Sequence, residues 1–356
     1  MGFIGSILVL SFLIFFHELG HFLAAKYFGV KVEAFSIGFG RQRIWKKKIG
    51  DTEYSLRPIP LGGFVQLKGQ SDIDPKLRNS DIDSLYGIAH WKRLVILAAG
   101  SFFNLLLAFL LFFAIGLLGK NELAPIVGKV ESTMPAGLAG LKSGDEIMLI
   151  NGNKIRTWGN LSNAVAESTG ALEVVFLRGS KEYTTTITPK YGASKNIFGE
   201  SIQRPLLGIT ASGEVRLVSY NILDSILYAF RETKESSKLI LQSIEKMFSG
   251  VVPLSEVGGV VSIVSITKKA TELGIVTLFA FSALISVNLG ILNLLPIPAL
   301  DGGHIIFTFY EMISKRIPTQ ETLYRLSLAG WIVLLGLMGL GLYNDILRIA
   351  NGTMPF

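Results

Sequence analysis

The sequence contains no cysteine and only four histidines among its 356 residues. The absence of cysteine excludes disulfide scaffolds, thiol nucleophiles and zinc sites with thiolate ligands. Charged residues are also scarce: they make up 17% of this chain, whereas a soluble protein usually carries about 25%. Because hydrophobic residues reach 49%, the composition excludes a disordered chain and disfavours a single soluble domain.

The few charges are unevenly distributed. Residues 94–119, 273–300 and 326–344 contain no Asp, Glu, Lys or Arg, and residues 1–25 contain only Glu18. Uncharged apolar segments of about 18 residues or more are typical of transmembrane helices. The sequence therefore predicts a polytopic α-helical membrane protein with about four spans, one in each of these segments. No basic residue precedes the first apolar run, which favours a retained span over a signal peptide.

The net charge of +7 indicates basic loops on the cytoplasmic side of a membrane rather than a nucleic-acid partner. Residues 26–92 form such a loop, with Lys or Arg next to both neighbouring spans. The positive-inside rule places this loop in the cytoplasm and the N-terminus outside. Residues 120 to about 270 are then predicted to lie outside the cytoplasm.

Residues 43–67 of the basic loop have the pattern of β-structure. A hairpin is expected around the turn at 48–51, and an apolar strand resumes at Phe64. The Pro- and Gly-rich stretch at 58–63 is expected to interrupt the strand between them. Such β-structure can enter a membrane only where protein or a water-filled cavity surrounds it.

The outer insert divides into two parts. Residues 125–190 read as a compact α+β module, with short strands at 126–127, 146–150 and 172–177 and a helix at 160–168. Residues 222–248 have the pattern of an amphipathic helix, which would lie on the membrane surface or against the insert.

The motif HELGH at residues 17–21 carries the strongest chemical signal. On a helix, His17 and His21 share one face about 6 Å apart along the axis, so both imidazoles can bind one Zn²⁺. Glu18 would then be the general base toward water. A charge buried in a span costs at least about 2.5 kcal/mol, so such residues usually serve a function. The alternative is that they sit at the interface and snorkel or form hydrogen bonds.

A catalytic zinc site needs a third protein ligand, and Asp301 is the best candidate. It is the first charged residue after the 28 uncharged residues 273–300. It lies in the segment NLLPIPALDGG (293–303), whose prolines preclude a regular helix. His17 lies about 24 Å along its span from the outer face, and Asp301 falls at the cytoplasmic end of its own span, so the depths agree. His304 is a rival ligand, and His90 reads as an interfacial histidine.

Three asparagines lie within predicted spans: Asn104, Asn288 and Asn293. A buried amide in lipid needs hydrogen-bond partners. These side chains could hold helices together, or they could bind the substrate backbone or a developing oxyanion.

Taken together, HELGH, GSFFN (100–104) and NLLPIPALDGG resemble the motifs of the site-2 protease family of intramembrane zinc metalloproteases. YSLRPIPLGGFV (54–65) is similar to the membrane re-entrant β region of bacterial members. PAGLAGLKSGDEIMLINGNKI (135–155) resembles a PDZ domain of their extracytoplasmic type. The sequence departs from the family at Ser101 and at Gly259, where proline is common, and it has one PDZ-like module where the best-known members have two.

The resemblance implies one Zn²⁺ per chain, bound by His17, His21 and Asp301, with Glu18 as general base. It also implies that Asn104 and Asn293 position the substrate or stabilise the intermediate. The family cuts single-pass membrane proteins, such as anti-sigma factors and remnant signal peptides, usually after another protease has removed their outer domain. The expected location is the bacterial inner membrane, with the active site toward the cytoplasm.

A substrate helix must unwind before its peptide bonds can be cut. We expect the hairpin edge near residues 57–65 to add to the substrate as a strand, while residues 293–298 contact its other side. The candidate residues on that edge are Arg57, Pro58, Ile59, Pro60, Gly62 and Gly63.

The predicted organisation comprises residues 1–118 with two spans and the re-entrant β loop, 119–210 as the PDZ-like domain, 211–270 as an amphipathic linker and 271–356 with two further spans. The PDZ-like module could recruit trimmed substrates or exclude those with bulky outer domains, and its single copy favours exclusion. Two rival functions are a metal transporter, which would need polar sites across the membrane, and an inactive scaffold, which would not need Glu18 and Asp301.

Overall fold

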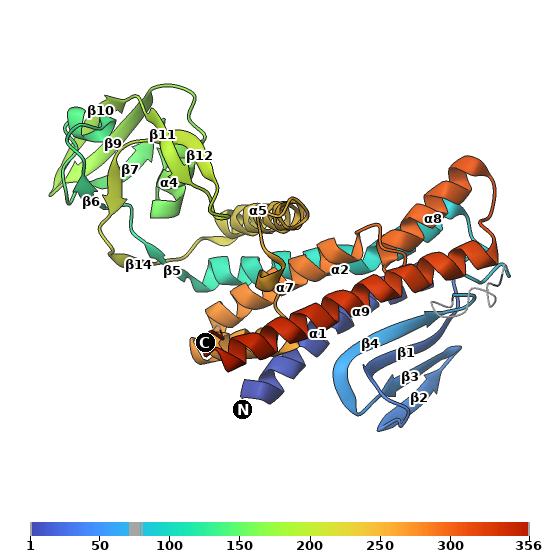
Figure 1. Cartoon of the computed structure of the whole chain (residues 1–356). Helices are drawn as coiled ribbons and strands as arrows, with labels where there is room; N and C mark the ends of the chain where they lie inside the picture. Colours follow the sequence, from blue (N-terminus) through green and yellow to red (C-terminus); the bar gives the residue numbers. More distant parts are fainter. Residues whose placement is uncertain (1, 71–78, 80, 355–356) are drawn as a thin grey trace. The chain divides into compact units, whose positions relative to one another are not determined.

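The computed structural model describes residues 2–70, 79 and 81–354, and the chain divides into two compact units. The first unit comprises residues 1–114 and 225–356, and the second comprises residues 115–224 (Figure 1). The first unit contains long helices and a four-stranded sheet, whereas the second contains most of the strands.

Four helices in the described part of the chain are long and apolar enough to cross a membrane: α1 (Gly2–Tyr27), α2 (His90–Leu118), α7 (Ile275–Asn293) and α9 (Gln320–Ala350). They coincide with the four predicted spans. The start of α1 and the end of α9 lie toward the same end of this unit, as an even number of spans requires (Figure 1). The remaining helices are α5 (Ile222–Phe248), over the predicted amphipathic segment, α6 (Val260–Glu272) and α8 (Asp301–Ser314).

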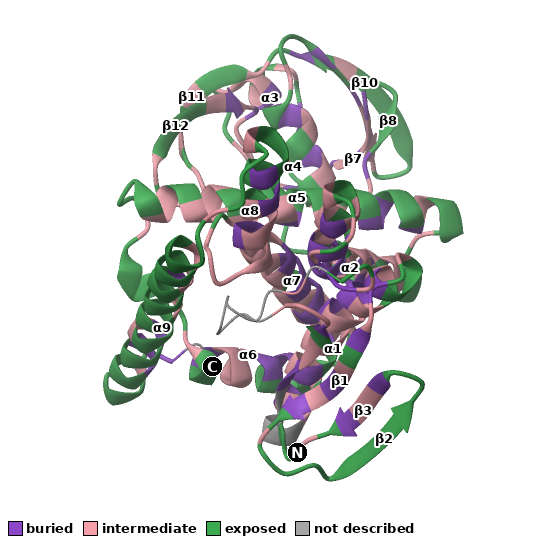
Figure 2. Cartoon of the chain, turned by 90° about the vertical axis from the view of Figure 1, so that its right-hand side faces the viewer, coloured by how far each residue is buried: buried purple, intermediate pink, exposed green. Residues whose placement is uncertain are grey.

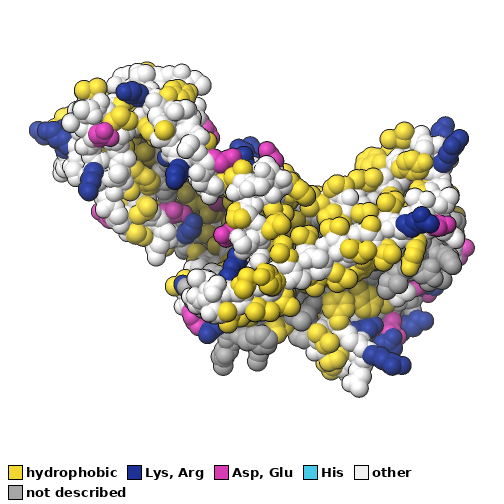
Figure 3. All heavy atoms as spheres, viewed as in Figure 1, with side chains coloured by type: hydrophobic (Ala, Val, Ile, Leu, Met, Phe, Trp, Pro, Cys, Tyr) yellow, Lys and Arg dark blue, Asp and Glu magenta, His cyan; other side chains and the backbone are white. Residues whose placement is uncertain are grey.

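On the face of this helical unit seen in Figure 3, many of the exposed side chains are hydrophobic. In the same view, Lys and Arg gather near the sheet and near the connection between α8 and α9. Helix α9 is largely exposed along its length (Figure 2). Within an apolar 18-residue stretch of this helix, only 11% of the stretch is buried inside the protein. An apolar helix with so little protein around it has the surface expected of a helix in contact with lipid.

The sheet of the first unit contains β1 (Val32–Phe39), β2 (Trp45–Ile49), β3 (Thr52–Leu56) and β4 (Ile59–Leu67), in the order β2-β3-β1-β4. The predicted hairpin is β2–β3, but β1 was not predicted. It packs on α1, with the ring of Phe35 5.0 Å from that of Phe22 and 5.8 Å from that of Phe15.

Residues 59–63 of the Pro- and Gly-rich stretch lie inside β4 and only Pro58 precedes it, so the expectation that this stretch would interrupt the strand was wrong from residue 59 onward. Strand β4 is at the edge of the sheet, where proline is tolerated because no further strand needs its N–H group. The pairing of β1 with β4 shifts register between Ile37 and Phe39, which absorbs the irregular backbone. Gly63 also has a packing role, because a Cβ there would lie 2.6 Å from the carbonyl oxygen of Ser36.

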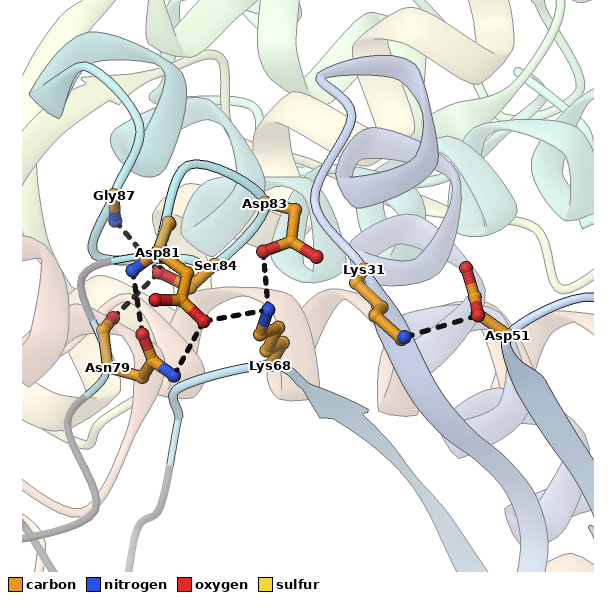
Figure 4. Close-up of polar contacts among 8 residues, drawn as sticks. All are labelled: Lys31, Asp51, Lys68, Asn79, Asp81, Asp83, Ser84 and Gly87. Atoms are coloured by element: carbon orange, nitrogen blue, oxygen red, sulfur yellow. Dashed lines mark hydrogen bonds and ion pairs between the residues drawn. The ribbon is translucent and has the colours of Figure 1, made fainter.

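Ion pairs and hydrogen bonds between polar side chains connect the end of β4 to the segment that leads into α2 (Figure 4). Lys68 Nζ lies 2.5 Å from Asp83 Oδ1 and 2.9 Å from Asp81 Oδ2. Asn79 Nδ2 also donates a hydrogen bond to Asp81 Oδ2. The ammonium group lowers the pKa of both carboxyl groups, and their hydrogen bonds raise the pKa of Lys68. A separate ion pair joins Lys31 to Asp51 at 3.1 Å.

Helix α7 ends at Asn293, and α8 begins at Asp301 after a turn. The predicted break in the helix is therefore present. Two glycines at the start of α8 make the tight turn possible: a Cβ on Gly302 would strike the backbone of Leu294 and Leu295, and one on Gly303 that of Ile297. This close packing fixes Asp301 as the first residue of its helix.

The second unit is an α+β domain with its own hydrophobic core, which includes Val127, Ile147, Leu161 and Phe176. The unit contains β5 (Lys120–Leu123), β6 (Val127–Val130), α3 (Pro135–Leu138), β7 (Glu146–Ile150), β8 (Asn153–Lys154), α4 (Trp158–Ala166), β9 (Leu172–Arg178), β10 (Lys181–Ile187), β11 (Lys190–Lys195), β12 (Ser201–Leu206), β13 (Ile209–Ala211) and β14 (Val215–Val218). Its central sheet has the order β10-β9-β7-β8. Because β14 pairs with β5, the unit extends to residue 224, beyond the predicted boundary at 210.

Candidate metal centre

Three side chains converge on one point of the helical unit. His17 and His21 lie one turn apart on α1, and Asp301 begins α8. Asp301 Oδ2 lies 3.1 Å from His17 Nε2 and 3.2 Å from His21 Nε2, and the two Nε2 atoms are 3.2 Å apart. Both histidines are buried, with 8% of each residue exposed.

These distances fit a zinc ion. With Zn–N and Zn–O bonds of about 2.0–2.1 Å, neighbouring ligands of a tetrahedral site are about 3.3–3.4 Å apart. Asp301 Oδ2 is buried and makes no hydrogen bond of acceptable geometry to any described residue, so its lone pairs remain available. One nitrogen or oxygen from each of three residues leaves a fourth position open, as a catalytic zinc site requires.

The neighbouring α2 helix sets the orientation of His21. Its Nδ1 lies 2.8 Å from the carbonyl oxygen of Ile96, which can only accept a hydrogen bond. Nδ1 therefore carries the proton, and Nε2 keeps its lone pair for a metal. Gly100 on the same helix faces both rings, since a Cβ there would lie 2.7 Å from His17 Cε1 and would overlap His21 Nε2.

Glu18 is held by the sheet. Its Oε2 accepts a hydrogen bond from the backbone N–H of Val65 on β4, at 2.9 Å. This bond occupies one carboxylate oxygen and leaves Oε1 as the oxygen for further chemistry. Because β4 is the edge strand, the same edge that holds Glu18 also offers backbone groups to an added strand.

A cavity of about 220 Å³ opens beside the cluster. Its lining combines the metal-binding side chains with amides and apolar groups: Ile14, His17, Glu18, Gln70, Asn104, Leu289, Asn293, Ala299, Leu300, Asp301 and His304. No sequence pattern indicated Gln70, which reaches the site only because it follows β4. His304 lines the cavity but lies outside the three-residue cluster that could hold a metal in the described part of the chain.

The three asparagines have different positions. Asn104 Nδ2 lies 3.2 Å from His17 Nδ1, and Asn293 Nδ2 lies 3.3 Å from His17 Nε2. Asn288 precedes Asn293 by five residues and is therefore about 140° away round α7. It does not line the cavity formed by the described residues, so the structure does not bring it to the site.

Arg57 serves the sheet rather than the cavity. Its Nε donates to Ser36 Oγ at 2.9 Å, its Nη1 donates to the Gly40 carbonyl at 2.7 Å, and its guanidinium lies over the Phe64 ring. Pro58 immediately precedes β4, and Ile59, Pro60, Gly62 and Gly63 lie along it.

A buried ion pair joins the start of α2 to α8. Arg93 Nη1 lies 2.7 Å from Glu311 Oε2, and each side chain is only 4% exposed. His90 Nε2 is 3.8 Å from the same Glu311 oxygen, which places His90 with this pair and not with the metal cluster. The pair connects the helix that supports the histidines to the helix that begins with Asp301.

The second unit has a groove of its own between α4 and residues 204–209. The α4 side is apolar and includes Trp158, Leu161 and Val165. Arg204 lies at the groove, and its buried Nε has no hydrogen-bond partner among the described residues.

Comparison with known proteins agrees with this geometry. Residues 5–337 match the model of "Peptidase family M50". The chain is 46% identical over 347 residues to a Campylobacter jejuni protein, covering 98% of this chain and 94% of that protein. It is 38% identical to a Helicobacter pylori protein (98% and 99% covered) and 34% identical to a Rickettsia conorii protein (97% and 98%). All three carry names that begin "Putative zinc metalloprotease".

Proposed function

Because this chain belongs to peptidase family M50, the site-2 protease family of membrane metalloproteases, we propose that it cleaves single-pass membrane proteins within or near their spans. The observation that carries the proposal is the convergence of His17 Nε2, His21 Nε2 and Asp301 Oδ2 beside Glu18, in a cavity between apolar helices. One Zn²⁺ per chain fits this site. Anti-sigma factors and remnant signal peptides are the substrate class proposed from the sequence motifs.

In the proposed reaction, bound zinc supplies Lewis acidity, which polarises a peptide carbonyl and acidifies water. Glu18 Oε1 accepts the proton of the attacking water and returns it to the leaving amine nitrogen. The hydrogen bond from Val65 N–H to Oε2 holds the carboxylate in place during both transfers. Asn293, on the cavity side of His17, donates to the substrate carbonyl or backbone.

Substrate binding is proposed to use the outer edge of β4. This strand pairs with β1 on one side, and its other edge is available within the described sheet. A substrate that unwinds and adds to this edge next to Val65 brings its backbone to the level of Glu18. Residues 293–298, at the end of α7 and in the turn after it, contact the other side of the substrate.

The second unit is proposed to be an extracytoplasmic PDZ-like module, in an inner-membrane protein whose active site lies toward the cytoplasm. The arrangement resembles RseP, the regulator of sigma-E protease, with one such module in place of two. Only Gly119 separates α2 from β5, and 219–221 separate β14 from α5, so both links are short. A closely tethered module favours steric exclusion of substrates with intact outer domains, while the groove near Arg204 is what a recruiting role would use.

The decisive test compares wild type with Glu18→Gln in detergent. We expect the variant to bind zinc as the wild type does and to lose cleavage of a single-pass test substrate, because only the proton acceptor is removed. Substantial residual turnover by Glu18→Gln would contradict the role of Glu18. A metal transporter would bind zinc without cleaving the substrate, and an inactive scaffold would do neither.

A further inference from the structure

The two ring nitrogens of His17 face different surroundings. Nε2 points to the metal cluster, 3.1 Å from Asp301 Oδ2. Nδ1 faces Asn104 on α2, whose Nδ2 is 3.2 Å away. Asn104 is fully buried, and its Oδ1 has no hydrogen-bond partner among the residues that the structure describes.

In this orientation of the Asn104 amide, two hydrogen-bond donors face each other at His17 Nδ1, and a rotation of the carboxamide removes this mismatch. A neutral imidazole carries its proton on one nitrogen, so an Nε2 that binds a metal requires the proton on Nδ1. Nδ1–H and the amide Nδ2–H₂ are both donors and cannot bond to each other. Turning the carboxamide by 180° exchanges its oxygen and nitrogen, which have nearly the same shape. The buried oxygen that lacks a donor then meets the buried N–H group that lacks an acceptor.

We infer that Asn104 is a positioning residue for the metal centre. Its Oδ1 accepts the Nδ1–H of His17 and holds that ring with Nε2 toward the zinc. His21 already has the equivalent support, because its Nδ1 lies 2.8 Å from the Ile96 carbonyl oxygen. Acceptors on α2 then orient both histidines: the backbone carbonyl of Ile96 orients His21, and the side-chain oxygen of Asn104 orients His17.

The packing of α7 against α2 fixes the position of Asn104. Ser286 Oγ donates to the backbone carbonyl of Asn104 at 2.7 Å. Gly290 lets the helices approach, since a Cβ there would lie 3.1 Å from Ser101 O and 3.4 Å from Asn104 Cβ. Asn293 differs from Asn104 because it is closer to Nε2 than to Nδ1 and is only partly buried.

This inference rests on the proposed function, because it presupposes that the site binds zinc. The experiment measures zinc affinity of the full-length protein in detergent, by competition with a chromophoric chelator. Asn104→Leu keeps the shape of the side chain and removes the acceptor, so we expect affinity to fall about 10–100-fold. Asn104→Asp keeps an acceptor and should stay within about threefold of wild type. Asn288→Leu is the matched control, since it removes an amide of the same size from α7 away from the cavity, and it should leave affinity unchanged.

The outcomes separate the inference from its premise. A wild-type protein that binds no zinc would overturn the proposed function itself. If wild type binds zinc and Asn104→Leu binds it equally well, the positioning role is overturned and the proposed function stands. Equal losses for Asn104→Leu and Asn104→Asp would also overturn it, because the hydrogen bond would then not be the cause. Thermal unfolding of the zinc-free variants checks the fold, and Asn104→Ala takes the place of the leucine variant if that one does not fold.

Discussion

Alanine at position 100 is expected to disable the metal centre while leaving the protein folded. Gly100 lies on α2 against both metal-binding rings. A Cβ at this position would lie 2.7 Å from His17 Cε1 and 2.8 Å from His17 Nε2, and it would overlap His21 Nε2. Ordinary van der Waals contact begins near 3.4 Å, so His17 would have to move by about 0.6–0.7 Å and His21 by more.

The size of this movement sets the expected effect. Ligand distances in a zinc site tolerate about 0.2 Å, which is roughly a third of the required shift. We therefore expect the zinc affinity of Gly100→Ala to fall at least about 10-fold and cleavage to fall about 100-fold. Overpacking costs about 1–3 kcal/mol, and the better helix propensity of alanine offsets about 1 kcal/mol of it. The net loss of stability should thus be at most about 2 kcal/mol.

The assay measures zinc affinity, thermal unfolding and cleavage of a single-pass test substrate for each variant. Gly336→Ala is the matched control, because it makes the same change inside α9, where nothing lies within 4 Å of the new Cβ. The control should keep wild-type affinity and activity. Wild-type zinc affinity and turnover in Gly100→Ala would refute the close packing of α2 against the histidines.

Three further outcomes follow from the same structure. Asp301→Ala should lower both zinc content and cleavage, because only two protein ligands remain, and a zinc-replete variant would transfer the third position to His304. Glu311→Ala leaves Arg93 buried without its carboxylate partner and should lower the free energy of unfolding by about 3–5 kcal/mol. Denaturant titration in detergent measures this loss, and a value below about 1 kcal/mol would contradict the burial of the pair. Replacing residues 124–214 by a short linker keeps the pairing of β5 with β14, and it should permit cleavage of substrates whose outer domain is intact. If the shortened protein still binds zinc but no longer cleaves trimmed substrates, the module recruits substrates and does not exclude them.

Local sequence determined the elements that depend on composition and periodicity. The uncharged apolar segments coincide with α1, α2, α7 and α9, because helix formation in lipid requires only length and hydrophobicity. The i, i+4 spacing put His17 and His21 on one face of α1, as any helix would. The two prolines before Asp301 marked the break between α7 and α8, because proline cannot continue a helix.

Tertiary structure decided which segments meet, and no local pattern contains that information. The N–H of Val65 reaches Glu18 from 47 positions along the chain, and the Ile96 carbonyl reaches His21 from 75. The same packing separated Asn104, at the ring edge of His17, from Asn288, whereas their positions within predicted spans gave no reason to distinguish them. The Pro-Gly stretch illustrates the same limit, because local propensity indicates a break whereas an edge position in the sheet tolerates the strand. Spans and ligand types therefore follow from residue chemistry, while ligand orientation and the placement of the base follow from contacts between distant segments.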